Sequence, residues 1–381
     1  MRLNFMTLLA SILACLGCVE LACLGLNSLG PERSTWQRGY RFDPGQDPET
    51  RQHAASPYRL RARLSELPAV NPNPEIPTDD YARLDLSRMH PNDFWGGPWK
   101  LAPSHRSHHL ITHATEGPVY DIWAETDRFG RRISARSAAA PKRRHAMLFG
   151  CSFAFGNGIR DEETLASQLA RHAPGLSAYN YGVPGSGPTE FVEQVAMRDL
   201  RSEVPEPEGV AIYLFIPDHV RRVPPSIHAL EHRRETPYWY EAAGGEVVRA
   251  GSFSAARPLA GLLYDLLSLS QTLKYMNVDF PTVFGPAEFR RAAVLTRKMA
   301  QEYQRQFPRG EFVVVLHPLG NAIARAFTRY LDELELKYLD YSDVQLGKLT
   351  KKSVHVSKYD WHPSGEANRL LGRQIVRDLG L

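Results

Sequence analysis

The sequence has little cysteine. Only four cysteines occur among its 381 residues, and Cys15, Cys18 and Cys23 share one apolar stretch near the N-terminus, which leaves Cys151 alone in the rest of the chain. This distribution excludes a disulfide framework within a domain. Cys15 and Cys18 have the spacing of a redox or zinc pair, but the second pair of ligands that a zinc site needs is missing. We therefore expect neither a bound metal nor a cofactor.

The chain also lacks a strong charge of either sign. Its 46 Lys and Arg residues are nearly balanced by 42 Asp and Glu residues, and the formal net charge is +4. A protein that binds the nucleic-acid backbone needs a much stronger basic surface, so we exclude nucleic acid as a partner. Solenoid repeats and low-complexity tracts are absent as well. The 43% of hydrophobic residues suffices for one large or two modest domains.

The N-terminal residues 1–30 read as a signal peptide or a membrane anchor. Phe5 to Leu26 is apolar except for small or weakly polar residues and Glu20. Its length favours an anchor, whereas a carboxylate deep in a spanning helix costs on the order of 2–3 kcal/mol. Cleavage and lipidation at Cys15 or Cys18 stay open. We expect a main domain that is extracytoplasmic (periplasmic) if the segment anchors it, or secreted if the segment is removed.

Residues 31–145 form a second region, rich in Pro, His, Arg and Asp and without helical periodicity. Turn-forming residues around Arg128 to Gly130 predict a hairpin within Val119 to Ser134. We interpret the region as a stalk with a small β-rich or irregular lead-in, and a partly disordered linker is the alternative.

From Ala146 onward, short apolar runs alternate with amphipathic segments. This alternation indicates an α/β domain over 146–381, in which helices cover both faces of a parallel sheet of about five strands. The expected strands are Met147 to Phe149, Ser177 to Tyr181, Val210 to Ile216, Phe312 to Leu316 and Lys337 to Tyr341, and the expected helices are Glu163 to His172, Glu190 to Val204, Ala322 to Leu334 and Ser364 to Leu379.

A long insertion at about 218–286 interrupts this order. It is too long for a bare loop, and an apolar helix is expected around Leu259 to Leu273. We predict a lid-like cap with helices of its own beside the site. The aromatic run Tyr238 to Tyr240 is more typical of core or lid packing than of a sugar-stacking platform.

Reactive side chains follow the predicted strands. In open parallel sheets, ligands bind outside the carboxyl ends of the strands. These positions hold Cys151 and Ser152, Gly182 to Gly187, Asp218 and His219, and His317, while Asp360 and His362 directly precede the last helix. A serine, a histidine and an acid thus fall where one pocket could collect them.

On these residues the chain, from about Ala146 to its end, resembles the SGNH/GDSL hydrolase superfamily. Gly150 to Phe153 is similar to the family's Gly-Asp-Ser block, which implies that Ser152 is the nucleophile. Asn180 to Gly185 resembles the second block, which implies a backbone N–H of Gly185, or of neighbouring Gly182, in the oxyanion hole beside that of Ser152. Asp360, His362 and Pro363 match the last block. The resemblance implies a three-layer, flavodoxin-like fold.

Three positions depart from the family pattern. Cys151 replaces the aspartate beside the nucleophile, and Asp360 precedes His362 by two residues instead of three, a spacing that the resemblance associates with the branch of polysaccharide O-acetylation proteins. Where the family has an oxyanion-hole asparagine, this chain has Asp218 and His219. Either His219 donates to the oxyanion, or Asp218 is protonated, or backbone N–H groups act alone.

The expected chemistry is that of a serine hydrolase. His362 acts as the base, Asp360 orients it, and Ser152 forms an acyl-enzyme with an O-acyl, in particular acetyl, ester of a glycan. Water as the acceptor gives an esterase and a sugar hydroxyl an O-acetyltransferase, while a degenerate domain that binds polysaccharide or scaffolds an envelope assembly is the non-enzymatic alternative. His317 is expected to be a structural hydrogen-bond partner, and His105, His108, His109 and His113 a solvated loop.

Overall fold

A computed structural model describes most of the chain. The described residues are 16–24, 41–42, 56–60, 83–97, 99–134, 142–227, 236–276, 278–281, 283–319 and 322–381. The predictions for Cys15, for the export segment before residue 16 and for residues 25–30 lie outside this part of the chain.

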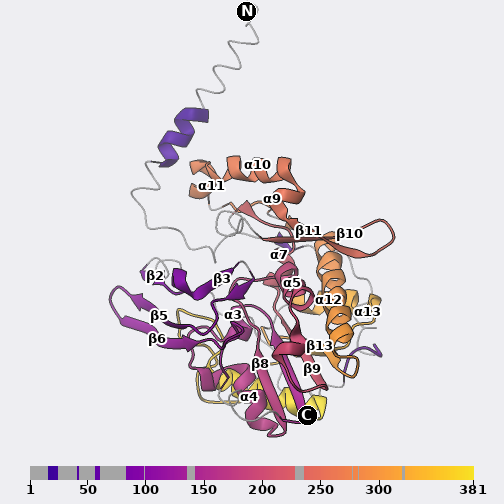
Figure 1. The fold of residues 1–381 in the computed structure, drawn as a ribbon. Coiled ribbons are helices and arrows are strands. Elements are labelled where there is room, and N and C mark those ends of the chain that lie inside the picture. The colour runs from indigo at the N-terminus through magenta and orange to yellow at the C-terminus, as the bar shows by residue number, and fades with distance from the viewer. Residues whose placement is uncertain are drawn as a thin grey trace, which may run out of the picture.

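A five-stranded parallel sheet forms the centre of the molecule (Figure 1). Its strands follow the order β14 (Tyr338–Asp340), β13 (Glu311–Leu316), β9 (Gly209–Phe215), β7 (Arg144–Phe149) and β8 (Leu176–Asn180). Every strand coincides with a predicted apolar run to within a few residues. The prediction of an α/β fold on about five parallel strands is confirmed.

Helices pack on both faces of this sheet. Helix α4 (Leu165–His172) contacts α14 (Gly365–Leu379), while α12 (Pro286–Gln306) contacts both α5 (Pro188–Met197) and α13 (Ala322–Glu333). Right-handed crossovers between the strands place these two groups on opposite faces. The helix predicted from Glu190 to Val204 is in fact two, because α5 ends before Asp199, whose side chain caps α6 (Leu200–Glu203).

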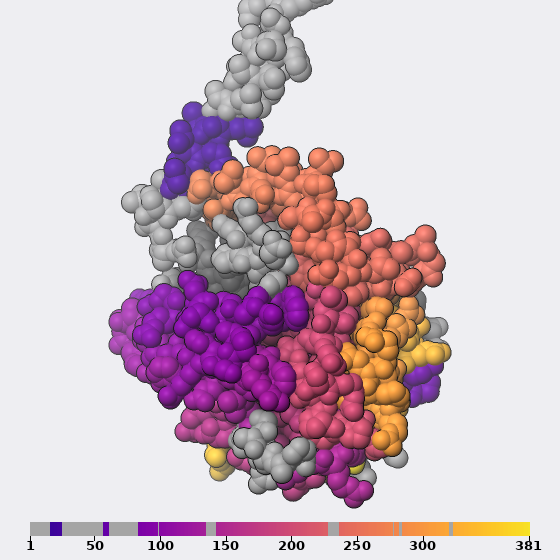
Figure 2. All heavy atoms as spheres, viewed as in Figure 1, coloured from indigo at the N-terminus to yellow at the C-terminus, as the bar shows by residue number. Residues whose placement is uncertain are grey.

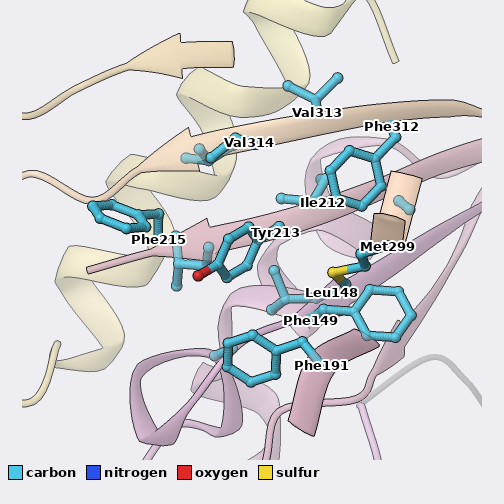
Figure 3. Close-up of a cluster of buried hydrophobic side chains, with 14 of the residues drawn as sticks. Leu148, Phe149, Phe191, Ile212, Tyr213, Phe215, Met299, Phe312, Val313 and Val314 are labelled. Atoms are coloured by element: carbon cyan, nitrogen blue, oxygen red, sulfur yellow. The ribbon is translucent and has the colours of Figure 1, made fainter. Parts of the chain in front are cut away.

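The main core lies between the sheet and the layer of α5 and α12. Figure 3 shows Phe191 of α5 and Met299 of α12 over side chains from the strands, among them Tyr213, Phe149 and Phe312. All five side chains are buried. Continuous burial on both faces explains why the strands read as unbroken apolar runs.

The lead-in folds into small antiparallel sheets. β2 (Leu84–Arg88), β5 (Arg106–His113) and β6 (Gly117–Glu125) form one, and β3 (Trp95–Gly97) with β4 (Lys100–Leu101), after the short turn η4 (Asn92–Phe94), forms another. The hairpin predicted within Val119 to Ser134 is misplaced, because β6 pairs with the preceding β5. The turn at 128–130 does form, but the segments that it connects are paired only through the isolated bridge between Thr126 and Arg132.

Segments of the lead-in also bond to the central sheet. Arg132 forms a bridge with Asn180 of β8, and the Ser134 hydroxyl donates to the Ala178 carbonyl over 2.7 Å. At the other side, the Leu60 amide donates to the Tyr338 carbonyl over 2.8 Å. A short parallel pair, β1 (Arg41–Phe42) with β12 (Val283–Phe284), joins the lead-in to the end of the insertion.

The insertion has secondary structure of its own. It begins with α7 (Asp218–Arg221) and continues with the hairpin β10 (Pro237–Glu241) and β11 (Val247–Ser252), followed by α9 (Phe253–Ala256), α10 (Pro258–Ser268) and α11 (Gln271–Tyr275). Trp239 is buried, and its indole N–H donates to Glu193 over 2.8 Å, so this aromatic residue belongs to the core packing that we expected. Whether the insertion covers the site stays a prediction.

Residues 16–24 form a helical segment at the same end of the molecule as α10 and α11 (Figure 1). Among the described residues, no helix combines the length and apolar character required to traverse a bilayer.

Candidate active site

Ser152 lies just after the end of β7, an inner strand of the sheet. The chain leaves β7 through Gly150 and turns directly into the four-residue helix α3 (Ser152–Phe155), in which Ser152 is the first residue. The side chain is 5% exposed, so it reaches the surface without projecting from it. Because a first-turn amide has no carbonyl one turn earlier, the backbone N–H of Ser152 is available to a ligand.

The structure brings the three predicted triad residues together. His362 Nε2 lies 2.8 Å from Ser152 Oγ, and His362 Nδ1 lies 2.5 Å from Asp360 Oδ1. The same carboxylate oxygen accepts the His362 backbone amide over 2.9 Å. A continuous hydrogen-bond chain therefore links the carboxylate, the imidazole and the hydroxyl, with Nε2 as the nitrogen that faces the serine.

The acid and the base come from the loop before α14. Ser364 caps this helix by accepting the Ala367 amide, and the His362 carbonyl accepts the Val356 amide, so the loop is fixed on both sides. Burial of Asp360 would raise its pKa, but the charge and hydrogen bonds of His362 outweigh it and hold the pKa below its ordinary value. Asp360 is thus ionised, as a residue that stabilises an imidazolium must be.

The second glycine-containing block lies against α3. The Val183 amide donates to the Gly150 carbonyl over 2.9 Å, and the Asn180 side chain joins the Ala154 carbonyl to the Gly182 amide. A Cβ at Gly182 would lie 2.2 Å from the Phe155 backbone nitrogen, so no larger residue fits there. The block therefore lies at the same end of the sheet as Ser152.

Gly185 has a left-handed backbone conformation. Its φ of 70° is strained for residues with a side chain and open to glycine. The role of the Ser152 and Gly185 amides as oxyanion donors stays a prediction.

His219 is completely buried and turned toward the core. Its Nδ1 lies 2.8 Å from the Tyr213 hydroxyl, its ring stacks on that of Tyr213, and Phe191 and Phe215 flank it. Burial lowers the pKa of His219 well below its ordinary value, so the ring is neutral. Nε2 has no hydrogen-bond partner in the described part of the chain, and donation from it to an oxyanion stays a prediction.

Asp218 forms ion pairs instead of carrying a proton. Its carboxylate lies 3.3 Å from Arg222 and 3.5 Å from Arg221. Burial would raise the pKa of Asp218, but the two guanidinium groups lower it below the ordinary value. Of the three alternatives drawn from the sequence, a protonated Asp218 is therefore the one that the electrostatics of the site oppose.

Arg222 is a site residue that the sequence did not reveal. Its guanidinium donates to the Ser186 carbonyl over 2.9 Å, pairs with Asp218, and lies beside the Cys151 thiol. It therefore connects the loop of Gly185 with the residue next to the nucleophile. The only signal was the pair Arg221 and Arg222 directly after the third block, a pattern that usually marks a solvated surface.

Two predictions about other histidines need correction. His317 is buried against Phe153 and, among the described residues, neither ring nitrogen has a hydrogen-bond partner, so it is not the structural hydrogen-bond partner that we expected. Burial lowers its pKa to about 3. The group from His105 to His113 lies mainly on β5 and not in a solvated loop, because the strand's alternation buries His109 and His113.

Cys151 is fully buried, with its sulfur 3.9 Å from Ser152 Oγ. Ser152 Oγ lies at hydrogen-bond distance, 2.8 Å, from His362 Nε2. We expect Cys151→Ala to keep most of the ester hydrolysis and to lose about 1 kcal/mol of stability from a small void. Iodoacetamide should label Cys151 quickly only after unfolding, which mass spectrometry of the digested protein would show. A dead Cys151→Ala beside an active Ser152→Ala would instead make the enzyme a cysteine hydrolase.

Counted along the chain, the strands of the central sheet follow the order 2-1-3-4-5, which is the flavodoxin-like order that the resemblance implied. No protein-family model and no curated protein matches the chain. Among solved structures it is similar to a family two carbohydrate esterase from Clostridium thermocellum in complex with cellohexaose (13% identity, 71% of this chain and 73% of that chain, TM-score 0.37). It is also similar to a putative lipolytic protein of the G-D-S-L family from Desulfitobacterium hafniense (11% identity, 61% and 98%, TM-score 0.29) and to a carbohydrate esterase family 2 enzyme from Corynascus thermopiles (12% identity, 71% and 75%, TM-score 0.35).

Proposed function

We propose that the protein is a serine esterase that removes O-acyl groups, in particular acetyl groups, from a glycan. One observation carries the proposal: the buried hydrogen-bond chain from Asp360 through His362 to Ser152. A serine hydroxyl is a weak nucleophile until a positioned base removes its proton, and the base in turn needs a third group to orient it. These residues supply each requirement.

The reaction follows from this geometry. His362 Nε2 takes the Ser152 proton as Oγ attacks the ester carbonyl carbon, and the backbone N–H groups of Ser152 and Gly185 are the proposed donors to the oxyanion. Asp360 keeps the Nδ1 proton in place and stabilises the imidazolium. His362 then protonates the departing sugar oxygen, which leaves an acyl-Ser152. A water molecule deprotonated by His362 releases the carboxylate and restores the serine.

The glycan substrate rests on the spacing of Asp360 and His362, which resembles that of polysaccharide O-acetylation proteins. The same branch motivates a second candidate, an O-acetyltransferase, in which a sugar hydroxyl replaces water at the acyl-enzyme. The non-enzymatic alternative, a degenerate polysaccharide-binding or scaffolding domain, rests on Asp218 in place of asparagine. The intact hydrogen-bond chain favours an enzyme over that alternative.

We further propose that the main domain is extracytoplasmic and tethered to a membrane through the N-terminal segment. The support is the apolar sequence from Phe5 to Leu26, with Arg2 before it. If the segment is cleaved, the same domain is secreted.

A fluorophosphonate probe separates an enzyme from a binding domain. It should attach to Ser152, which peptide mass spectrometry would locate, because the probe reacts with activated serines. Acetate release from an acetylated glycan, measured with and without an unacetylated acceptor sugar, then distinguishes the reactions: transfer would reduce free acetate and acetylate the acceptor. A chain that neither reacts with the probe nor releases acetate would be a binding or scaffolding protein.

A further inference from the structure

Helix α10 exposes an apolar face. Leu259, Leu262, Leu263 and Leu266 recur with the spacing of one helix face and are between 51% and 83% exposed. In a soluble domain this face is the one that packs against the core. In α10 the apolar face points toward solvent instead. A large exposed apolar patch of this kind marks a surface that binds a protein or a membrane.

The opposite face of α10 is fixed to the protein. Gly261 packs against Ser254, and the Tyr264 ring lies 5.8 Å from the rings of Phe253 and Phe280. These contacts determine the rotation of the helix about its axis. The leucines thus project outward as a consequence of packing.

A second apolar helix lies at the same end of the molecule as α10 and α11. In the helical segment 16–24, Leu16, Val19, Leu21 and Leu24 are between 47% and 70% exposed. Figures 1 and 2 show this segment, in indigo, beside α10 and α11 at one end of the molecule. Two segments about 240 residues apart in sequence therefore contribute apolar side chains to the same end.

Glu20 joins helix 16–24 to the start of α11, the helix that follows α10. Its carboxylate accepts hydrogen bonds from the Ser270 hydroxyl over 2.6 Å, from the Gln271 amide, and from the Thr272 amide over 3.3 Å. These are the first donors of α11, which a helix start otherwise leaves to water. Glu20 is the one charged residue between Phe5 and Leu26. A carboxylate close to lipid is costly unless protein groups donate hydrogen bonds to it. The hydrogen bonds of Glu20 meet this requirement, so its charge is compatible with membrane contact.

We propose that helix 16–24 and the leucine face of α10 together form a surface that docks into the interface of a lipid bilayer. The inference rests on the membrane tether proposed above and adds a second contact, from the insertion, which fixes how the domain stands on the membrane.

Lipid fits this surface better than a protein partner does. The outward face of α10 offers leucine side chains, whereas protein interfaces combine an apolar centre with polar groups that specify the partner. Exposed Arg257 before α10 and exposed Lys274 in α11 flank the leucines with positive charge, as in helices that lie on anionic membranes. In the sequence, helix 16–24 belongs to the apolar stretch from Phe5 to Leu26.

The test uses the full chain in phosphatidylcholine and phosphatidylglycerol vesicles whose acyl chains carry bromine. A tryptophan introduced by Leu263→Trp should be quenched by the bromine several-fold more strongly than one introduced by Met197→Trp, after subtraction of the wild-type fluorescence. The two sites are matched, since Leu263 is 51% and Met197 54% exposed. In the unmodified chain, vesicles should also slow hydrogen exchange of the α10 amides.

Several outcomes would overturn the proposal. Equal quenching at both sites would show contact without a specific face. A Leu263→Trp fluorophore already shielded from acrylamide before lipid is added would mean that the chain itself covers α10, or a second copy if light scattering shows a dimer. Turnover of a soluble acetyl ester by Leu263→Trp distinguishes the two proposals. Normal turnover without membrane contact would overturn the docking proposal alone. Membrane contact without turnover would overturn the esterase proposal alone.

Discussion

Ser152→Ala and His362→Ala should each lower kcat for a simple acetyl ester by roughly 10⁴- to 10⁶-fold, the range seen when one member of a serine triad is removed. The two residues act as one unit through their 2.8 Å contact. The double variant should therefore be little worse than either single variant. Steady-state hydrolysis of p-nitrophenyl acetate, with the probe reaction as a titration of active sites, measures all three.

His317→Ala provides the matched control for this prediction. His317 is buried near the site and touches Phe153, which also lies beside His362, but it belongs to neither end of the hydrogen-bond chain. We expect this variant to keep its turnover within about tenfold, because it loses packing and not a proton acceptor. Normal turnover in His362→Ala together with an inactive His317→Ala would assign the base to His317.

Arg132→Leu should be the most destabilising single change in the lead-in, at about 3–5 kcal/mol, the cost of removing one partner from a buried ion pair. The guanidinium is completely buried, pairs with Asp161 over 2.8 Å, and donates to the carbonyls of Phe155, Gly156 and Ile159. Its loss would remove a buried donor from each of those carbonyls. Because Phe155 ends α3, hydrolysis should fall as well. Urea unfolding followed by fluorescence measures the stability.

The neighbouring Arg160 is the control for Arg132. It pairs with Glu163 and Glu162, but its side chain is 66% exposed. Arg160→Leu should therefore change stability by less than about 1 kcal/mol. If Arg132→Leu does not fold at all, Arg132→Lys, which keeps the charge and loses the fork of donors, should fold with an intermediate stability. Equal unfolding midpoints for the Arg132 and Arg160 variants would contradict the role assigned to Arg132.

The sequence predicted the sheet well because its strands are buried on both faces. A run such as Val210 to Phe215 is apolar throughout, so no helical spacing of polar residues competes with the interpretation as a strand. A residue that favours turns follows soon after it. The 21-residue helix α12 was missed, although Pro286 begins it and the Glu288 side chain accepts the Gly285 amide at its start. Its buried stripe contains Ala292, Ala293 and Ala300, small residues that give a weak hydrophobic period.

The proximity of Ser152, His362 and Asp360 could be predicted from order and spacing, while the surroundings of the site could not. A motif says which residue follows a strand but not where its side chain points, and His219 points toward Tyr213 inside the core. Arg132 is a buried cation that donates mainly to backbone carbonyls distant in sequence, and the partly buried Arg222 donates to the Ser186 carbonyl, 36 residues before it. The local sequence does not indicate such contacts, so charged residues of this kind are interpreted as exposed to solvent.

The bonds of the lead-in to β8 and β14 have a consequence for how the chain could be shortened. These two are the edge strands of the central sheet. An uncovered edge strand presents unpaired backbone amides and carbonyls, which can pair with strands of other molecules. Ser134 and Arg132 occupy the β8 side, and Tyr58 to Leu60 the β14 side. A fragment that starts at Ala146 would keep Ser152, His362 and Asp360, but both of its edge strands would be uncovered. It would also lack Arg132, so we expect it to aggregate and to hydrolyse esters more slowly than the full chain.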